Sequence, residues 1–149
     1  ATATIPGFED ESDDSSISPK PDALALFNPV FDKSPDGFGY ERVKDRWREF
    51  SPLHNLGKGV PPAIVFLGTR DPLLPVPTAA SFKRRMNEAG TRCDVWAYKD
   101  QGHAFFNYCN GSNPYFNATI YEADRFLSLL GYLDGEPTLQ NKAVEATRL

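Results

Sequence analysis

Three short, mainly apolar runs divide the chain, and residues that interrupt regular structure lie beside them. They cover residues 23–27, 63–67 and 93–98. The first ends at Asn28-Pro29 and the second at Gly68, so neither is long enough for a typical helix. A short run that is apolar throughout is typical of a strand buried on both faces of a parallel sheet. We therefore predict three buried strands.

Amphipathic patterns lie between these strands and after them. Apolar residues recur at spacings of three and four over residues 40–50, 77–89 and 115–130, with polar residues between them. This period predicts helices that each place one face on a core. Pro77 suits a first helical turn, and Gly90 suits the position after a helix. Strands separated by helices predict an α/β fold with about three parallel strands.

The other segments have the composition of loops. Residues 9–20 are acidic and rich in serine, and residues 31–40 contain glycine, proline and several acids. Residues 132–149 have no clear period, and we expect them to form a surface tail. We find no internal repeat and no second domain, so residues 1–149 are interpreted as a single domain.

Composition narrows the classes of function. The 149 residues are 40% hydrophobic and 13% aromatic, which is typical of a globular protein. The net charge is −4, and no basic patch favours nucleic acid. No apolar run approaches the roughly 20 residues of a membrane helix, so we expect no membrane partner. Residues 1–8 lack the features of a secretory signal, which leaves the location open, with the cytoplasm as our expectation.

Candidate chemistry follows the second and third strands. Asp71 comes just after one strand and His103 just after the next, each in a turn that contains glycine. The carboxyl ends of parallel strands meet at one edge of a sheet, where functional groups gather. An acid and a histidine at this edge form the orienting half of a catalytic triad. We expect Gly102 to leave room beside the ring, and Phe105 and Phe106 to exclude water and contact substrate.

Simpler interpretations exist for these residues. An aspartate after a strand is usually a turn residue that accepts hydrogen bonds from nearby backbone. His54 has no acid or cysteine at ligand spacing, which predicts a structural or surface role, and Arg70 has the pattern of a surface arginine. Cys93 and Cys109 lack the spacing of a zinc site, and their pairing stays open. We predict neither a metal nor a cofactor.

Two stretches resemble the C-terminal part of α/β-hydrolases. Residues 62–76 contain Gly-Thr-Arg-Asp, and residues 95–106 contain Gly-His-Ala-Phe. They are similar to the motifs that follow the seventh and eighth strands of esterases and lipases related to dienelactone hydrolases and prolyl oligopeptidases. The resemblance implies that Asp71 and His103 are two members of a Ser-Asp-His triad, in an enzyme that hydrolyses carboxylic esters. Residues 23–29 resemble the sixth strand, and residues 40–56 resemble a cap-like segment.

The sequence departs from that family in one large respect. It contains no Gly-x-Ser-x-Gly pentapeptide and no His-Gly-Gly oxyanion loop, and its early serines lie in the acidic loop. Residues 1–5 resemble the end of the helix that follows the nucleophile. The resemblance therefore implies an incomplete domain, the C-terminal half of a hydrolase. We expect the isolated chain to be a weak or inactive esterase that would act on a small ester if completed.

The missing half has a structural consequence. In the family, the sixth strand pairs with a fifth strand, which has no counterpart here. Residues 23–27 should then form an open, apolar sheet edge, and such edges seek partners. We expect a homo-oligomer or association with an N-terminal hydrolase half.

Two other functions remain open. One is a non-catalytic α/β interaction module derived from a hydrolase. The other is a flavodoxin-like or receiver-like module that uses Asp71 as a strand-end acid, although the sequence lacks the further acids of a receiver's metal site. The distance between Asp71 and His103 separates the enzyme hypothesis from the first of these alternatives.

Overall fold

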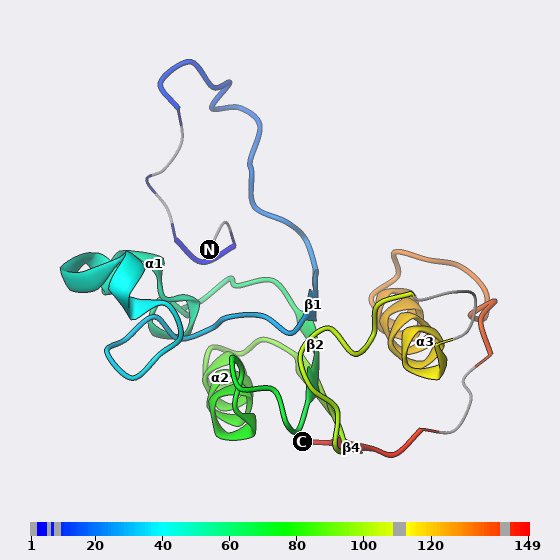
Figure 1. Ribbon diagram of the computed structural model, residues 1–149. Helices are drawn as coiled ribbons and strands as arrows, with labels where there is room; N and C mark the ends of the chain where they lie inside the picture. Colours follow the sequence, from blue (N-terminus) through cyan, green and yellow to red (C-terminus); the bar gives the residue numbers. More distant parts are fainter. Residues whose placement is uncertain (1–2, 6, 8–9, 109–112, 141–143) are drawn as a thin grey trace.

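The computed structural model describes residues 3–5, 7, 10–108, 113–140 and 144–149. Its centre is a four-stranded sheet with the order β1-β2-β3-β4 (Figure 1). The strands are β1 (Leu24–Phe27), β2 (Ala63–Gly68), β3 (Cys93–Tyr98) and β4 (Ala146–Arg148). The first three are parallel, and β4 pairs antiparallel with β3. The predicted α/β class with three parallel strands is confirmed.

Helices cover both faces of the sheet. Figure 1 shows α2 (Val76–Glu88) and α1 (Trp47–Phe50) on one side and α3 (Pro114–Leu129) on the other. Alternate residues of β2 face the two layers. Val65 and Leu67 belong to the core that includes α2, while Ile64 and Phe66 pack in the core that includes α3. The run is apolar throughout because both faces of β2 are covered.

The first strand differs from the prediction of burial on both faces. Leu24, Leu26 and Phe27 are only partly buried, and Ala25 is exposed. Within the part of the chain that the structure describes, β1 pairs with β2 alone. It is therefore an edge strand with an open, apolar side, as the resemblance to the hydrolase half predicted.

The helix predicted over residues 40–50 is not continuous. The segment forms two 3₁₀ turns, Tyr40–Arg42 and Lys44–Arg46, followed by the single turn of α1. Lys44 has a φ of 43°, a left-handed conformation that interrupts a right-handed helix. None of the residues in these turns is fully buried, so packing does not enforce one long helix.

The two longer helices match their predicted ranges within a few residues. Asn113 caps α3, because its side-chain oxygen accepts a hydrogen bond from the Tyr115 backbone N–H at 2.9 Å. Gly90 follows α2 with a φ of 80°, a conformation that glycine adopts without strain. None of the helices in the described ranges combines the length and the apolarity that a membrane span requires.

The two ends of the chain differ from their predictions. Residues 3–4 form a turn, and residues 1–2 of the expected helix end lie outside the described residues. Near the other end, residues 146–148 form β4 instead of a surface tail. Arg148 attaches β4 to β3, because it binds the carboxylate of Asp94 in β3 at 2.5 Å. Arg92, just before β3, binds the same carboxylate at 2.6 Å. Only the tertiary structure brings Arg148 to Asp94.

We expect the attachment of β4 to depend on this carboxylate. Burial raises the pKa of Asp94, but hydrogen bonds from Arg92 and Arg148 outweigh burial and hold the pKa below 3.8. Ionised Asp94 therefore stabilises β4 above that pH, and this contribution is lost as the pH falls through the lowered value. Arg148→Ala should speed hydrogen exchange of β4 amides about tenfold or more at neutral pH, since charged hydrogen bonds contribute roughly 1.5–3 kcal/mol and the half-exposed Arg148 favours the lower end of that range. Arg84→Ala, which removes an exposed arginine of α2, is the control and should leave that exchange unchanged.

Candidate active site

The turns after β2 and β3 meet at one edge of the sheet. The register places Gly68 beside Tyr98, so both strands end together. Hydrogen bonds join the two turns, from Thr69 N–H to the Tyr98 carbonyl at 2.9 Å and from Arg70 N–H to the Gln101 carbonyl at 2.8 Å. These bonds fix the backbone that carries the two candidate residues.

Asp71 and His103 come together as the sequence predicted. Nδ1 of His103 lies 3.0 Å from Oδ2 of Asp71, within hydrogen-bond distance. The Asp71 side chain is 0% exposed, and the His103 side chain is 44% exposed. Because a carboxylate only accepts, Nδ1 must carry the proton in this contact, which leaves Nε2 as the basic nitrogen of the neutral ring. When Nε2 takes up a proton near the surface, the buried Asp71 carboxylate can stabilise the positive charge of the ring.

The Asp71 carboxylate also holds its own turn. Oδ1 accepts hydrogen bonds from the backbone N–H groups of Leu73 at 2.8 Å and Leu74 at 3.4 Å. Asp71 is therefore both a turn residue, through Oδ1, and the partner of His103, through Oδ2. Oδ2, the oxygen that faces His103, also accepts a hydrogen bond from Nδ2 of Asn28.

Asn28 is the residue of this group that sequence reasoning missed. We treated Asn28-Pro29 as a strand breaker, although Asn28 follows β1 at the same sheet edge where Asp71 follows β2. A polar residue directly after a third parallel strand was the available signal.

The close approach of the two turns requires a glycine at position 68, which the sequence did not indicate. Beyond its two chain neighbours, one of which is His103, a Cβ on Gly102 would meet nothing within 4 Å, and the room that Gly102 leaves beside the His103 ring stays a prediction. A Cβ on Gly68 would lie 2.2 Å from the carbonyl oxygen of Gln101, far inside van der Waals contact. Gly68 lets the end of β2 approach the turn that leads to His103.

The backbone beside His103 includes two residues in the left-handed region. Asp100 has a φ of 59° and Ala104 a φ of 60°. This conformation is unfavourable for alanine, so the surrounding contacts must hold Ala104 in place. Arg70 forms an ion pair with Asp100 at 2.7 Å, and both side chains are more than half exposed. Arg70 is a surface residue, as predicted.

Phe105 and Phe106 pack inward as part of an aromatic cluster. The centroid of the Phe105 ring lies 5.0 Å from that of Tyr98 and 5.6 Å from that of Tyr115. The centroids of the Phe106 and Phe27 rings are 5.0 Å apart. These contacts tie the His103 turn to β1, β3 and α3. Packing accounts for both rings, and their contact with substrate stays a prediction.

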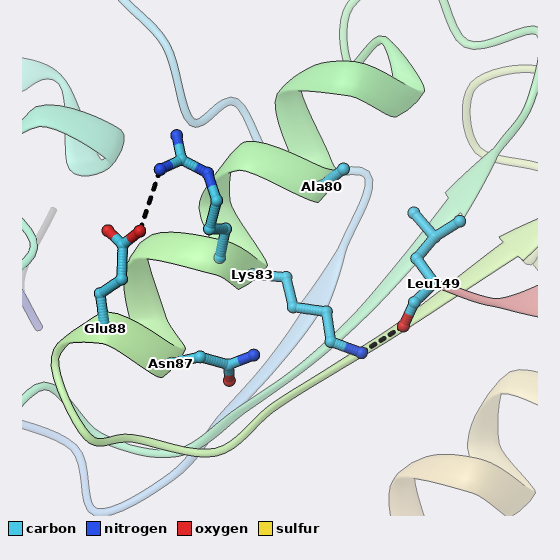
Figure 2. A pocket seen from close by; sticks show the side chains of 6 residues that line it. Ala80, Lys83, Asn87, Glu88 and Leu149 are labelled. Carbon is cyan, nitrogen blue, oxygen red and sulfur yellow. Dashed lines mark hydrogen bonds and ion pairs between the residues drawn. The ribbon is translucent and has the colours of Figure 1, made fainter.

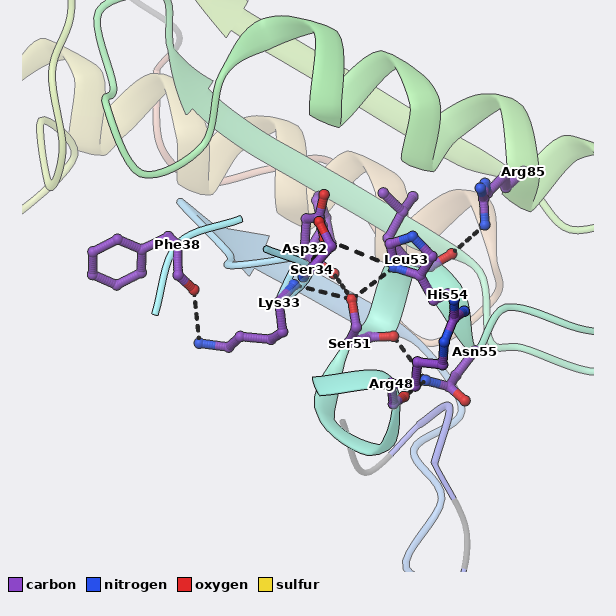
Figure 3. Close-up of polar contacts among 11 residues, drawn as sticks. Asp32, Lys33, Ser34, Phe38, Arg48, Ser51, Leu53, His54, Asn55 and Arg85 are labelled. Carbon is purple, nitrogen blue, oxygen red and sulfur yellow. Dashed lines mark hydrogen bonds and ion pairs between the residues drawn. The ribbon is translucent and has the colours of Figure 1, made fainter. Parts of the chain in front are cut away.

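A second cluster contains serine, histidine and aspartate but lacks the geometry of a triad. Figure 3 shows Ser51 beside His54, with the Ser51 Oγ 2.8 Å from Nδ1 of the ring. The Asp32 carboxylate lies 3.8 Å from the same nitrogen, whereas a triad uses one ring nitrogen for each partner. Ser51 is fully buried, and its Oγ also accepts a hydrogen bond from Lys33 N–H.

His54 therefore has the structural role that we predicted. Burial lowers the pKa of His54, with Arg85 and Arg48 acting in the same direction and Asp32 opposing them. Its ring packs edge-on against Trp47 at 4.8 Å. The cluster joins the segment after β1 to the turn after α1.

An open hollow of about 520 Å³ lies against α2, away from the dyad (Figure 2). Its polar contacts are a hydrogen bond from Lys83 to the backbone oxygen of Leu149 and an exposed ion pair between Arg84 and Glu88. Neither Asp71 nor His103 lines it, and it adds no chemistry to the candidate site.

The described residues contain no group of three His, Cys, Asp or Glu side chains placed to hold a metal. Cys93 is a buried free cysteine, and burial raises the pKa of its thiol to about 12. Cys109, whose pairing the sequence leaves open, lies outside the described residues.

Comparisons with known proteins identify the family. The dienelactone hydrolase family matches residues 48–131, more than half of the chain. A comparison with curated proteins gives no match. Among solved structures, esterase 2 of Thermogutta terrifontis phosphoramylated by tabun is 36% identical, with a TM-score of 0.81 over 91% of this chain and 51% of that chain. The propionate-bound form of this thermophilic esterase is 34% identical, with a TM-score of 0.80 over 91% and 53%.

The similarity therefore covers nearly all of this chain but only part of the esterase. The chain spans about half the length of the solved structures that it matches. The matched region contains β2, α2, β3, the two turns with Asp71 and His103, and α3. This protein belongs to the dienelactone hydrolase family.

Proposed function

We propose that this chain supplies the acid and histidine of a serine esterase active site. The observation that carries the proposal is the buried Asp71 carboxylate, which holds Nδ1 of the partly exposed His103 ring at 3.0 Å. An interaction module would need neither a buried anion at the sheet edge nor a histidine oriented by it. Structures of the Thermogutta terrifontis esterase with propionate and butyrate bound favour esters with short acyl chains as substrates.

The proposed chemistry uses the two ring nitrogens of His103 differently. Nε2 removes the proton from a serine hydroxyl as the serine oxygen attacks the ester carbonyl carbon. Asp71 accepts the Nδ1–H hydrogen bond and stabilises the imidazolium that forms. The imidazolium then donates its proton to the departing alcohol oxygen, and an acyl-enzyme remains. Water repeats the sequence, which releases the carboxylic acid and restores the serine.

The serine and the oxyanion donors come from outside these 149 residues in this proposal. They would belong to a longer polypeptide or to a separate chain that binds here. The open side of β1 supports such completion, since it is apolar and pairs only with β2 among the described strands. A strand added to β1 would continue the parallel sheet. Self-association through the same edge is the competing way to cover it.

A chimaera tests the proposal. The part of the Thermogutta terrifontis esterase that this chain does not match is placed before residue 1, and hydrolysis of a p-nitrophenyl butyrate ester is measured. We expect the isolated chain to hydrolyse the ester no faster than its His103→Ala variant. The chimaera should hydrolyse it, and its own His103→Ala variant should not. Light scattering on the same samples should show an associating isolated chain and a monomeric chimaera.

Two results would contradict the proposal in different ways. Strong activity of the isolated chain that disappears with His103→Ala would show that it holds a complete site. Activity of a folded chimaera that survives His103→Ala would show that His103 is not the base. A clean monomer of the isolated chain would count against the expected association at β1.

A further inference from the structure

Asn28 occupies a position that its backbone alone does not explain. It follows the last residue of β1, is only 6% exposed, and has a φ of 44°. Its backbone N–H donates to the Phe66 carbonyl at 2.9 Å and so extends the pairing of β1 with β2. Glycine would meet these backbone requirements at least as well as asparagine. The reason for an asparagine must lie in its side chain.

The side-chain amide contacts both halves of the dyad. Nδ2 donates to Oδ2 of Asp71, the same oxygen that faces His103. Oδ1 accepts a hydrogen bond from the backbone N–H of Ala104, the residue after His103, at 3.2 Å. One buried group therefore binds the acid and the turn that carries the histidine.

The two partners determine which chemical group can stand there. A carboxylate only accepts and a backbone N–H only donates, so the group between them must donate on one side and accept on the other. An amide does both in a single orientation. A carboxylate at position 28 could accept the hydrogen bond from Ala104 but would place a second negative charge beside Asp71. An apolar side chain could bind neither partner.

We propose that Asn28 is a positioning residue that sets the orientation of the Asp71 carboxylate and the placement of the His103 ring. The inference rests on the proposed function, since it concerns the same site. Nδ2 occupies one acceptor direction of Oδ2 and directs the other to His103. Oδ1 holds the backbone at Ala104, whose φ of 60° is unfavourable for alanine. Asn28 acts through Asp71 and His103 and touches no reacting atom.

The His103 ring reports this role without any catalysis. The chain has two histidines, so nitrogen NMR of the labelled 149-residue chain gives two ring spectra, which His103→Gln assigns. In the parent chain, the neutral ring of His103 should be mainly the Nδ1–H form that Asp71 selects. Asn28→Gly tolerates the positive φ and removes both side-chain bonds. Asn28→Asp keeps the shape and the acceptor for Ala104 but replaces the donor to Asp71 with an acceptor.

We expect both variants to reduce the neutral Nδ1–H population of His103 by about threefold or more, because the amide no longer directs Oδ2 to the ring. Asn87→Asp makes the same chemical change on the exposed face of α2 and should leave His103 unchanged. The His54 spectrum, which lies in a separate cluster, serves as the check that each variant is folded. If Asn28→Gly fails to fold, Asn28→Asp decides the matter alone. A folded variant whose His103 ring keeps the parent spectrum overturns the proposal.

Kinetics of the chimaera separate this inference from the proposed function. Asn28→Asp should lower kcat by about 10- to 100-fold with little change in KM, as a displaced catalytic group does. If His103→Ala leaves the hydrolysis rate unchanged while Asn28→Asp alters the His103 ring, the proposed function fails and the positioning role stands. If His103→Ala abolishes hydrolysis and Asn28→Asp changes neither the ring nor kcat, the positioning role fails alone.

Discussion

His103→Ala and Asp71→Asn should each lower the rate of ester hydrolysis by the chimaera by about three to four orders of magnitude, the range that loss of one triad member causes. His103→Ala removes the base. Asp71→Asn leaves a side chain of the same shape, but its amide no longer selects the Nδ1–H form of the ring. Because the two residues act as one unit, the double variant should be no slower than His103→Ala alone.

The second histidine provides a matched control. His54→Ala removes a ring that contacts Ser51 and Trp47 in another part of the fold, so it should leave kcat within about twofold of the parent, as expected for a residue that takes no part in transition-state binding. Stability separates the two dyad residues as well. His103 is half exposed, whereas buried Asp71 holds Leu73, Leu74 and Asn28, so only Asp71→Ala should destabilise the fold strongly. Equal rates for the His54→Ala and His103→Ala chimaeras would reject the assignment.

Gly68→Ala should be the most damaging small substitution at this sheet edge. The added Cβ would lie 2.2 Å from the Gln101 carbonyl oxygen and 2.7 Å from that of Gly102. Both obstacles are backbone, so the end of β2 and the His103 turn must separate. That movement breaks the bond from Arg70 N–H to Gln101 and moves His103 away from Asp71. We expect a loss of about 3 kcal/mol in the free energy of unfolding, at the upper end of overpacking costs.

Gly102→Ala is the control for this prediction. A Cβ at Gly102 meets no atom within 4 Å beyond its two chain neighbours, so the free energy of unfolding should change by less than about 0.5–1 kcal/mol. Urea unfolding of the two variants measures both values, and the His103 ring spectrum follows the dyad. A Gly68→Ala variant as stable as Gly102→Ala would show that the two turns do not need their close approach.

The sequence by itself determined the main helices and strands and the two candidate catalytic residues, Asp71 and His103. β2 is continuously apolar and β3 is apolar apart from Asp94, because helices cover both faces of the sheet, so short buried strands could be predicted without a structure. The helical spacing of apolar residues in α2 and α3 was equally clear, since each helix buries the residues of one face. Asp71 and His103 were found because a polar residue after a buried parallel strand has few reasons to be there apart from a turn or a site.

Tertiary structure decided what depends on partners far away in the chain. Position at the sheet edge left β1 half exposed, which the resemblance to a hydrolase half predicted but the apolar pattern of residues 23–27 did not. The contact of Arg148 with Asp94 helped to make a strand of residues 146–148. The requirement at Gly68 comes from a carbonyl that approaches from another turn. Asn28 has its role for the same reason. An asparagine before a proline has the pattern of a breaker until the fold places its amide between a carboxylate and a backbone N–H.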